Sequence, residues 1–313
     1  MNPLKKRKIW IVFRIDFQWI EIMKTMIFTF LLTLIISVNL KAKENYNILF
    51  IISDDLTYTA LSCYGNEICK TPNIDKLAKE GVRFTQAYCQ GTYCGPSRAS
   101  FMSGYYPHAT GVLGYKNPRP QIGDRSMWSQ HFRNHGYHAA RVSKIFHMGV
   151  PGGIESGGDG ADDSLSWDEK YNSKGLEWRA PGDGETLQKN PDGKRPVVGG
   201  NTFVVVEADG DDLVHSDGKT AKKAVELLEK YQSMEKPFWL GVGFVRPHVP
   251  FVAPRKYYKP FKPYSKMVLP EKFPGNWDDI PKAGINYCTS ENMQMDIRKQ
   301  KKAVGGYYAS VAY

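Results

Sequence analysis

The stretch Asn47-Ile48-Leu49-Phe50-Ile51-Ile52-Ser53-Asp54-Asp55 decides the fold class of this chain. Its first seven residues form a short, continuous apolar run rich in isoleucine, which is typical of a strand covered on both faces. The run ends in two adjacent carboxylates. We therefore expect a buried strand of a parallel sheet, with acidic side chains at its carboxyl end.

Strands and helices alternate along the rest of the chain. We expect helices at 71–80, 97–103, 126–134 and 217–232, and further strands at 82–87, 137–142 and 237–245. This alternation predicts an α/β fold with a central, mostly parallel sheet flanked by helices. Residues 149–200 are rich in glycine, aspartate and proline and show little periodicity, which indicates a functional excursion or a surface insertion.

Several polar residues follow the predicted strands directly. In parallel sheets, ligands gather at the carboxyl ends of the strands. The residues that fall just past such ends are Asp54, Asp55, Lys144, His147 and His248. We expect them to converge on one site.

The charge of the chain is concentrated at its N-terminus. The 313 residues carry a formal charge of +10, and residues 1–42 contribute +5 of it. Met23-Lys24 and the apolar run 27–38 resemble a secretory signal peptide, with a membrane anchor as the alternative. We expect 1–42 to be leader and signal peptide, with Met23 as the true start, and 43–313 to be the catalytic domain. This predicts a secreted or periplasmic protein without a stable membrane span after cleavage, and gives little support to nucleic-acid binding.

Five cysteines are present, Cys63, Cys69, Cys89, Cys94 and Cys288. An odd number in an exported protein suggests that one thiol is reactive or modified. No Cys-x-x-Cys pair occurs, so a zinc or redox site has little support.

Cys94-Gly95-Pro96-Ser97-Arg98 has the form Cys-x-Pro-x-Arg and continues as Ala99-Ser100-Phe101-Met102-Ser103-Gly104. A lone cysteine is most often a buried structural thiol. The helix expected after Pro96 would place Cys94 near a helix N-terminus, which favours anions. The motif and its continuation resemble those of the type I, formylglycine-dependent sulfatases. The chain looks most like the iduronate 2-sulfatase branch, from about Asn47 to its end and least in 149–200.

This resemblance implies an alkaline-phosphatase-like fold and a specific chemistry at Cys94. A formylglycine-generating maturation enzyme would oxidise Cys94 to an aldehyde, which is hydrated at rest. One hydroxyl of the diol would attack sulfur, and the second would expel the sulfate by elimination. Arg98 would support the diol oxygen and a metal ion.

The resemblance also assigns roles to three residues near strand ends. Lys144 would contact the sulfate as a point charge, and His147 would hydrogen-bond the formylglycine. His248 would protonate the leaving alcohol or bind a sulfate oxygen. Without the resemblance, these residues would be interpreted as a charged loop and half-buried histidines.

Asp54 and Asp55 can both reach one hard cation if the chain turns at the strand end. A solvated turn or a helix cap is the alternative. The resemblance implies calcium, held by Asp54, Asp55 and the oxygen derived from Cys94. Sulfatases carry further calcium ligands in a later segment, whereas this sequence stops at Tyr313. We therefore expect an N-terminal portion of a sulfatase, with its C-terminal part missing, an open sheet edge, weak calcium binding and little activity.

The sequence thus predicts hydrolysis of the sulfate ester of a sulfated carbohydrate. One alternative is a phosphomonoester or phosphonate hydrolase with the same site plan. Another is a non-catalytic binder of sulfated glycans, if Cys94 stays unconverted or the fragment is inactive.

Overall fold

The structure is a computed structural model that describes residues 21, 23–30, 45–188, 202–270, 281 and 295–313. The chain divides into two units, residues 1–46 and 47–313. In the first unit, residues 23–30 are helical. Among the described residues, no helix combines the length and apolar character needed to cross a membrane. Part of the predicted signal peptide, 31–42, lies outside the described residues.

In the described part of the second unit, four parallel strands form the central sheet. They are β1 (Ile48–Asp54), β6 (Phe238–Pro247), β2 (His138–Ser143) and β3 (Glu169–Tyr171), in that spatial order. All four run in the same direction, so their carboxyl ends lie at one edge of the sheet. The predicted α/β class and parallel sheet are confirmed.

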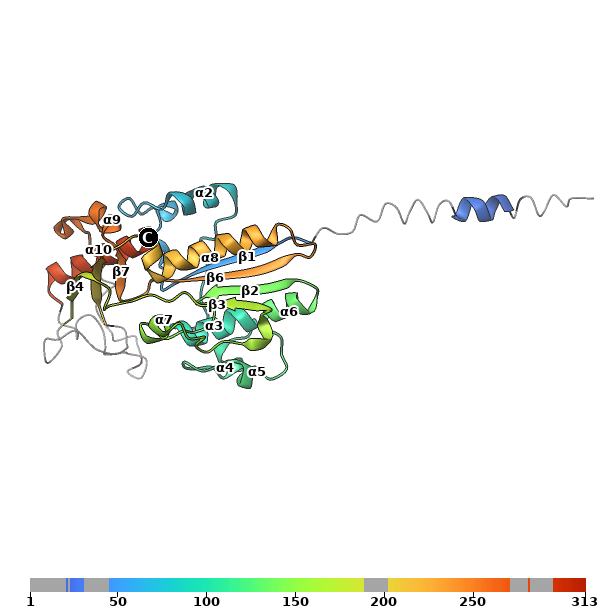
Figure 1. Ribbon diagram of the computed structural model, residues 1–313, viewed down its shortest axis with the longest axis horizontal. Helices are drawn as coiled ribbons and strands as arrows, with labels where there is room; N and C mark the ends of the chain where they lie inside the picture. Colours follow the sequence, from blue (N-terminus) through green and yellow to red (C-terminus); the bar gives the residue numbers. More distant parts are fainter. Residues whose placement is uncertain (1–20, 22, 31–44, 189–201, 271–280, 282–294) are drawn as a thin grey trace, which may run out of the picture. The chain divides into compact units, whose positions relative to one another are not determined.

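Helices cover both faces of this sheet (Figure 1). On one face lies α8 (Ser216–Tyr231), where Ala224 and Leu227 pack against Val142 and Leu240. On the other lie α3 (Cys94–Ser103) and α6 (Trp128–Asn134), packed around the fully buried Trp239. The two layers hold the strand ends, and the start of α3, in fixed positions.

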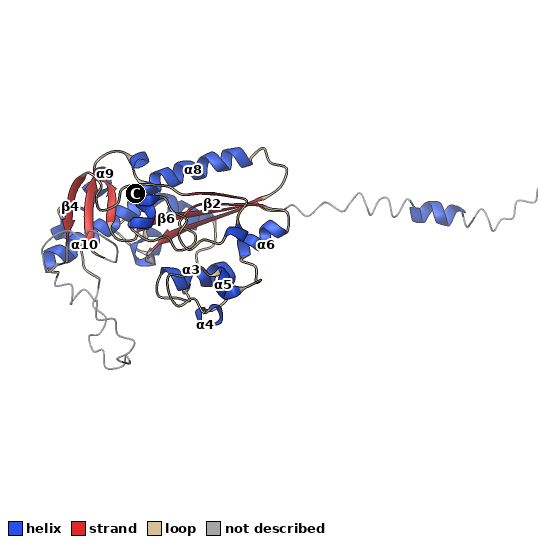
Figure 2. Ribbon diagram, turned by 60° about the horizontal axis from the view of Figure 1, so that its bottom comes forward, coloured by secondary structure: helices blue, strands red, loops and turns tan. Residues whose placement is uncertain are grey.

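A second sheet contains β4 (Gly182–Thr186), β5 (Val204–Ala208) and β7 (Phe251–Pro254) (Figure 2). Its first pair is antiparallel and its second parallel. Helix α10 (Ile297–Ala312) packs on it through Ala303 and Ala309. The remaining short helices are α2 (Pro72–Glu80), α4 (Pro107–Thr110), α5 (Arg119–Ile122), α7 (Gly152–Ser156) and α9 (Arg255–Tyr258), with 3-10 turns at Tyr58–Ala60, Ser62–Tyr64, Ser164–Ser166, Asp212–Val214, Lys259–Phe261 and Tyr264–Lys266.

Two expectations about local structure were wrong. Residues 82–87 form no strand, and Val82 and Phe84 are 81% and 71% exposed. A β-favouring run becomes a strand only when a neighbouring strand pairs with it, and no strand among the described residues does so here. Residues 149–200 are less irregular than expected, because they contain α7, β3 and β4. These elements are too short to produce a recognisable periodicity, and 189–200 lie outside the described residues.

Strand β1 lies at the edge of the central sheet. Within the described part of the chain it pairs with β6 alone, and Leu49 and Ile51 on one of its faces are 45% and 55% exposed. The expectation that this strand is covered on both faces is therefore wrong in the described structure, because an edge strand leaves these side chains open to solvent.

Candidate active site

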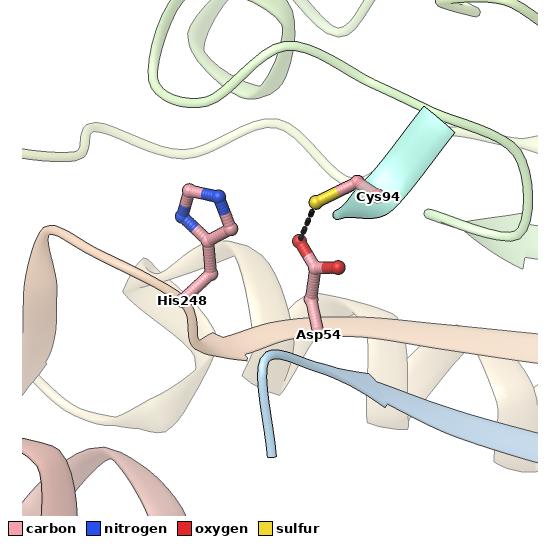
Figure 3. A group of neighbouring side chains, drawn as sticks. All are labelled: Asp54, Cys94 and His248. Carbon is pink, nitrogen blue, oxygen red and sulfur yellow. Dashed lines mark hydrogen bonds between the residues drawn. The ribbon is translucent and has the colours of Figure 1, made fainter. Parts of the chain in front are cut away.

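The predicted site residues gather at the carboxyl edge of the central sheet. Asp54 is the last residue of β1, Lys144 directly follows β2, and His248 directly follows β6. Figure 3 shows Asp54 and His248 rising from neighbouring strand ends, with Cys94 entering from the start of α3. Residues from four separate stretches of sequence therefore meet, as expected for a parallel sheet.

Asp54 lies at the electrostatic centre of this group. Its carboxylate is 3% exposed and accepts a hydrogen bond from Arg98 Nη2 at 2.7 Å and another from Lys144 Nζ. Burial alone would raise the pKa of Asp54, but the charges of Arg98 and Lys144 outweigh it and hold that pKa well below its usual range. The carboxylate therefore stays ionised.

Arg98 connects helix α3 to the end of β2. It is buried, and its Nη1 donates to the carbonyl oxygens of Lys144 at 2.5 Å and Ile145 at 2.8 Å. One guanidinium thus fixes both the carboxylate of Asp54 and the backbone that carries Lys144. A lysine could not make this forked set of contacts.

Lys144 is fully buried, and a tight backbone arrangement places it. Its amide donates to Gly243 O at 3.1 Å. A Cβ at Gly243 would lie 2.1 Å from the carbonyl oxygen of Lys144, so only glycine fits there. The preceding Ser143 has a positive φ of 59°, which turns the chain out of β2 and into the site.

Cys94 is the first residue of α3, and its Sγ lies 3.9 Å from Asp54 Oδ2. Burial, followed by the charge of Asp54, raises the pKa of the thiol to about 11. The thiol is therefore protonated at neutral pH and is a poor nucleophile as it stands. Replacement of the sulfur by oxygen would remove this limitation.

Asp55 and His248 face each other across the mouth of the site. Asp55 has a positive φ of 60°, and its carboxylate, 51% exposed, lies 3.5 Å from His248 Nε2. The ring of His248 is buried, and its Nδ1 contacts the carbonyl oxygen of Val249. Burial and the neighbouring charge of Lys144 lower the pKa of His248.

His147 lies beside this group, stacked on Tyr115 with ring centroids 4.1 Å apart. Its Nδ1 is buried and has no hydrogen-bond partner in the described structure. Burial, together with Lys144, lowers the pKa of His147 to about 4. The imidazole is therefore neutral at neutral pH, and its buried Nδ1 is unpaired among the described residues.

A cavity of about 310 Å³ opens over Cys94 and His248. Its other lining residues are Asp55, Thr92, Tyr93, Tyr115, Phe203, Pro247, Val249, Phe251 and Tyr307. Five of the lining side chains are aromatic, and Cys94, His248 and Asp55 lie among them, which suits a partly apolar ligand that reaches Cys94.

The acidic residues fit a hard cation. Asp54, Cys94 and His248 offer ligand atoms within 4.8 Å of one another, and Asp55 adds a carboxylate beside His248. Of the predicted metal group, the structure brings Asp54 and Cys94 together beside His248, whereas Asp55 lies outside this cluster, so calcium binding by Asp54 and Asp55 stays a prediction. The two carboxylates suit calcium, whereas a protonated thiol does not. Oxygen at position 94 would complete a set of three oxygen donors, fewer than the six to eight that calcium takes.

Sequence reasoning missed several residues that shape the site. Tyr307 in α10 donates from its hydroxyl to Asp55 O at 2.7 Å and accepts from Thr57 N at 2.8 Å. Tyr115 was overlooked as well, because nothing in its local sequence points to His147. Arg246 carried a signal that could have been used, since it adjoins His248 in Arg-Pro-His-Val-Pro.

Comparison with known sequences identifies the protein family to which this fold and this site belong. A profile of the Sulfatase family matches residues 46–313, and the chain belongs to that family. Mouse iduronate 2-sulfatase is 31% identical over 297 residues, which are 87% of this chain and 50% of the mouse protein. A sulfatase of Formosa agariphila is 27% identical over 285 residues, covering 87% of this chain and 54% of the relative. The chain thus spans about half the length of these relatives.

Among solved structures, the phosphonate monoester hydrolase of Agrobacterium radiobacter is similar, with a TM-score of 0.60 at 19% identity. The match covers 86% of this chain and 56% of that structure. At this identity the likeness concerns the fold alone, and the predicted alkaline-phosphatase-like architecture is confirmed.

Proposed function

We propose that this chain carries the catalytic centre of a sulfatase that hydrolyses sulfate esters of carbohydrates. The observation that carries the proposal is the position of Cys94, at the first residue of α3 and 3.9 Å from a carboxylate bound by two cations. A thiol with a pKa of about 11 has little use there as a nucleophile, whereas an oxidised side chain would meet a site prepared for an anion.

Conversion of Cys94 to formylglycine, by a separate maturation enzyme, would supply a hydrated aldehyde as the oxygen nucleophile toward sulfur. Lys144 presents a buried ammonium to the sulfate oxygens, where low dielectric strengthens the attraction. Arg98 keeps Asp54 ionised and fixes the backbone of Lys144. The assignment of His147 as a hydrogen-bond partner of a hydroxyl on residue 94 comes from the resemblance, and its unpaired Nδ1 supports it.

His248 is the candidate acid for the leaving alcohol. Its pKa is lowered by burial and by Lys144, so the ring is mainly neutral before substrate binds. An anion bound at Lys144 would offset that charge, and Asp55 at 3.5 Å favours the imidazolium. The bound sulfate ester therefore promotes protonation of the ring that gives its proton to the departing oxygen.

Asp54 and Asp55 would hold calcium, which would supply positive charge that stabilises sulfate oxygens. Further oxygen ligands would come from outside the described residues, from water or from the substrate. The resemblance to iduronate 2-sulfatase and the aromatic residues that line the cavity support a proposal for the substrate class. We propose a sulfated polysaccharide with a uronic acid or hexose, and a secreted or periplasmic location.

The decisive test is mass spectrometry of the tryptic peptide 84–98, which contains both Cys94 and Cys89. After co-expression with a formylglycine-generating enzyme and alkylation, a converted peptide carries one alkyl group, on Cys89. Conversion itself lowers the mass by roughly 18 units. A peptide alkylated at both cysteines would contradict the proposal and favour a non-catalytic glycan binder.

Turnover of 4-nitrophenyl sulfate and 4-nitrophenyl phosphate then separates the two hydrolase classes. The proposal predicts faster release from the sulfate. A preference for the phosphate would replace it with a phosphomonoester or phosphonate hydrolase. A panel of sulfated oligosaccharides then identifies the sugar.

A further inference from the structure

A buried ion network lies directly behind His248. Arg246 is 4% exposed, and its Nη1 donates to the carbonyl oxygens of His248 at 2.8 Å and Pro250 at 2.7 Å. Its Nη2 donates to Glu177, which is fully buried. The guanidinium therefore joins both sides of the turn that carries the candidate acid.

A second carboxylate holds the strand from which this turn leaves. Asp217, at the start of α8, accepts from Val245 N at 3.0 Å and from Arg246 N at 2.7 Å. Burial alone would lower the pKa of Arg246, but Glu177 and Asp217 outweigh it and raise that pKa. The arginine therefore stays charged and is fixed at its backbone and at its side chain.

Glu177 comes from the 149–200 region, which the sequence left without a role. Its Oε1 accepts from Ser216 Oγ at 3.2 Å, so α8 holds the carboxylate in place. A Cβ at Gly175 would lie 2.7 Å from Ser216 N, which shows how closely the two segments approach. The region thus reaches behind the active site and supplies the counter-charge for Arg246.

We propose that Arg246, held by Glu177 and Asp217, is a positioning residue that sets the ring of His248 for proton transfer to the leaving alcohol. The inference rests on the proposed function, because it needs His248 as the acid. The ring's Nδ1 contacts Val249 O within the same turn, so the turn sets the direction of Nε2. Without the guanidinium of Arg246, two backbone carbonyls and one carboxylate would lose their hydrogen-bond donor. The turn that carries His248 would then no longer be held in one conformation.

The test uses two aryl sulfates that differ in leaving group, 4-nitrophenyl sulfate and phenyl sulfate. The nitrophenolate leaves without a proton, whereas the more basic phenolate needs one. Loss of acid catalysis therefore lowers kcat for phenyl sulfate selectively, and His248→Ala sets the full size of this effect. We expect Arg246→Lys to lower kcat for phenyl sulfate about 10-fold more than for the nitrophenyl ester, with little change in KM.

Arg119→Lys is the matched control. Arg119 also bonds a buried carboxylate, that of Asp163, and two backbone carbonyls, those of Gly123 and Arg125, but it contacts none of the proposed site residues. Its replacement should lower both rates by the same factor. Glu177→Gln, of nearly the same shape, tests the network if Arg246→Lys does not fold, and should shift the rate ratio in the same direction.

The outcomes distinguish the inference from the proposed function. If His248→Ala changes the ratio of rates but Arg246→Lys and Glu177→Gln do not, Arg246 is merely structural and the inference is wrong, while the proposed function stands. If His248→Ala leaves the ratio unchanged, the acid role of His248 and the inference both fail. Sulfate release by wild type in the same assay reports separately on the proposed function.

Discussion

Replacement of Asp54 by asparagine tests the electrostatic centre of the site. The carboxylate is buried and bonded to Arg98 and Lys144, which are 3% and 0% exposed. A neutral amide at this position would leave two buried cations without a counter-charge. Arg98 keeps its two carbonyl partners, so Lys144 bears most of the loss. Breaking a buried pair in this way costs about 3–5 kcal/mol.

A double substitution tests whether the lost stability comes from an ammonium group that has no counter-charge. Asp54→Asn combined with Lys144→Met removes both the carboxylate and the stranded ammonium. We therefore expect the double variant to be more stable than Asp54→Asn alone, with a coupling of about 1–3 kcal/mol. Urea unfolding followed by circular dichroism, in EDTA so that no metal contributes, measures all four proteins.

The pH dependence follows from the lowered pKa of Asp54. A depressed carboxyl pKa adds stability above the unfolded value of 3.8, and this stability is lost as pH falls toward the folded value. The difference between wild type and Asp54→Asn should thus be constant near pH 7 and shrink by about 1 kcal/mol at pH 3. The buried ion group of Asp54, Arg98 and Lys144 would be refuted if Asp54→Asn lowered the free energy of unfolding by less than about 1 kcal/mol at pH 7. It would also be refuted if the double variant were less stable than Asp54→Asn.

Three further predictions concern neighbouring residues. Gly243→Ala should destabilise the protein by about 1–3 kcal/mol in urea unfolding, because its Cβ would lie 2.1 Å from Lys144 O; an unchanged midpoint would contradict this packing. His147 should stay neutral down to about pH 4 in NMR titrations, and Lys144→Met should raise its pKa; titration near 6.5 in wild type would disprove the burial. Before conversion, Cys94 should react with iodoacetamide at pH 7.5 far more slowly than the exposed Cys89, and equal rates would show that the thiol is accessible and ionised.

The fold could be predicted where apolar runs are long. The runs at 47–53 and 237–245 became the adjacent parallel strands β1 and β6, and β6 is buried along its length as a continuous apolar run predicts, whereas one face of β1 is exposed. The three-residue strand β3 could not be predicted, since it is specified by pairing with β2 and not by its own residues. The run at 82–87 has strand composition without a partner. Whether residues 82–87 are exposed depends on which segments pack near them, and their own sequence does not specify this.

The site residues could be predicted where a charged or polar side chain directly follows a predicted strand. Asp54, Lys144 and His248 were expected to converge and do so, although their catalytic roles remain predictions. Glu177 and Asp217 could not be recognised, because their importance arises from burial beside Arg246, and the three residues come from a loop, from α8 and from β6. Contacts between residues that are far apart in the sequence produce no local motif from which they could be predicted.

Sulfate release by the Cys94→Ala variant, measured beside a Cys89→Ala control, examines the central claim most directly. Both substitutions would be made in the full-length gene product, which would be co-expressed with a formylglycine-generating enzyme and supplied with calcium and 4-nitrophenyl sulfate. We predict that Cys94→Ala falls to the background rate while Cys89→Ala keeps the wild-type rate. Undiminished sulfate release by Cys94→Ala would contradict the account.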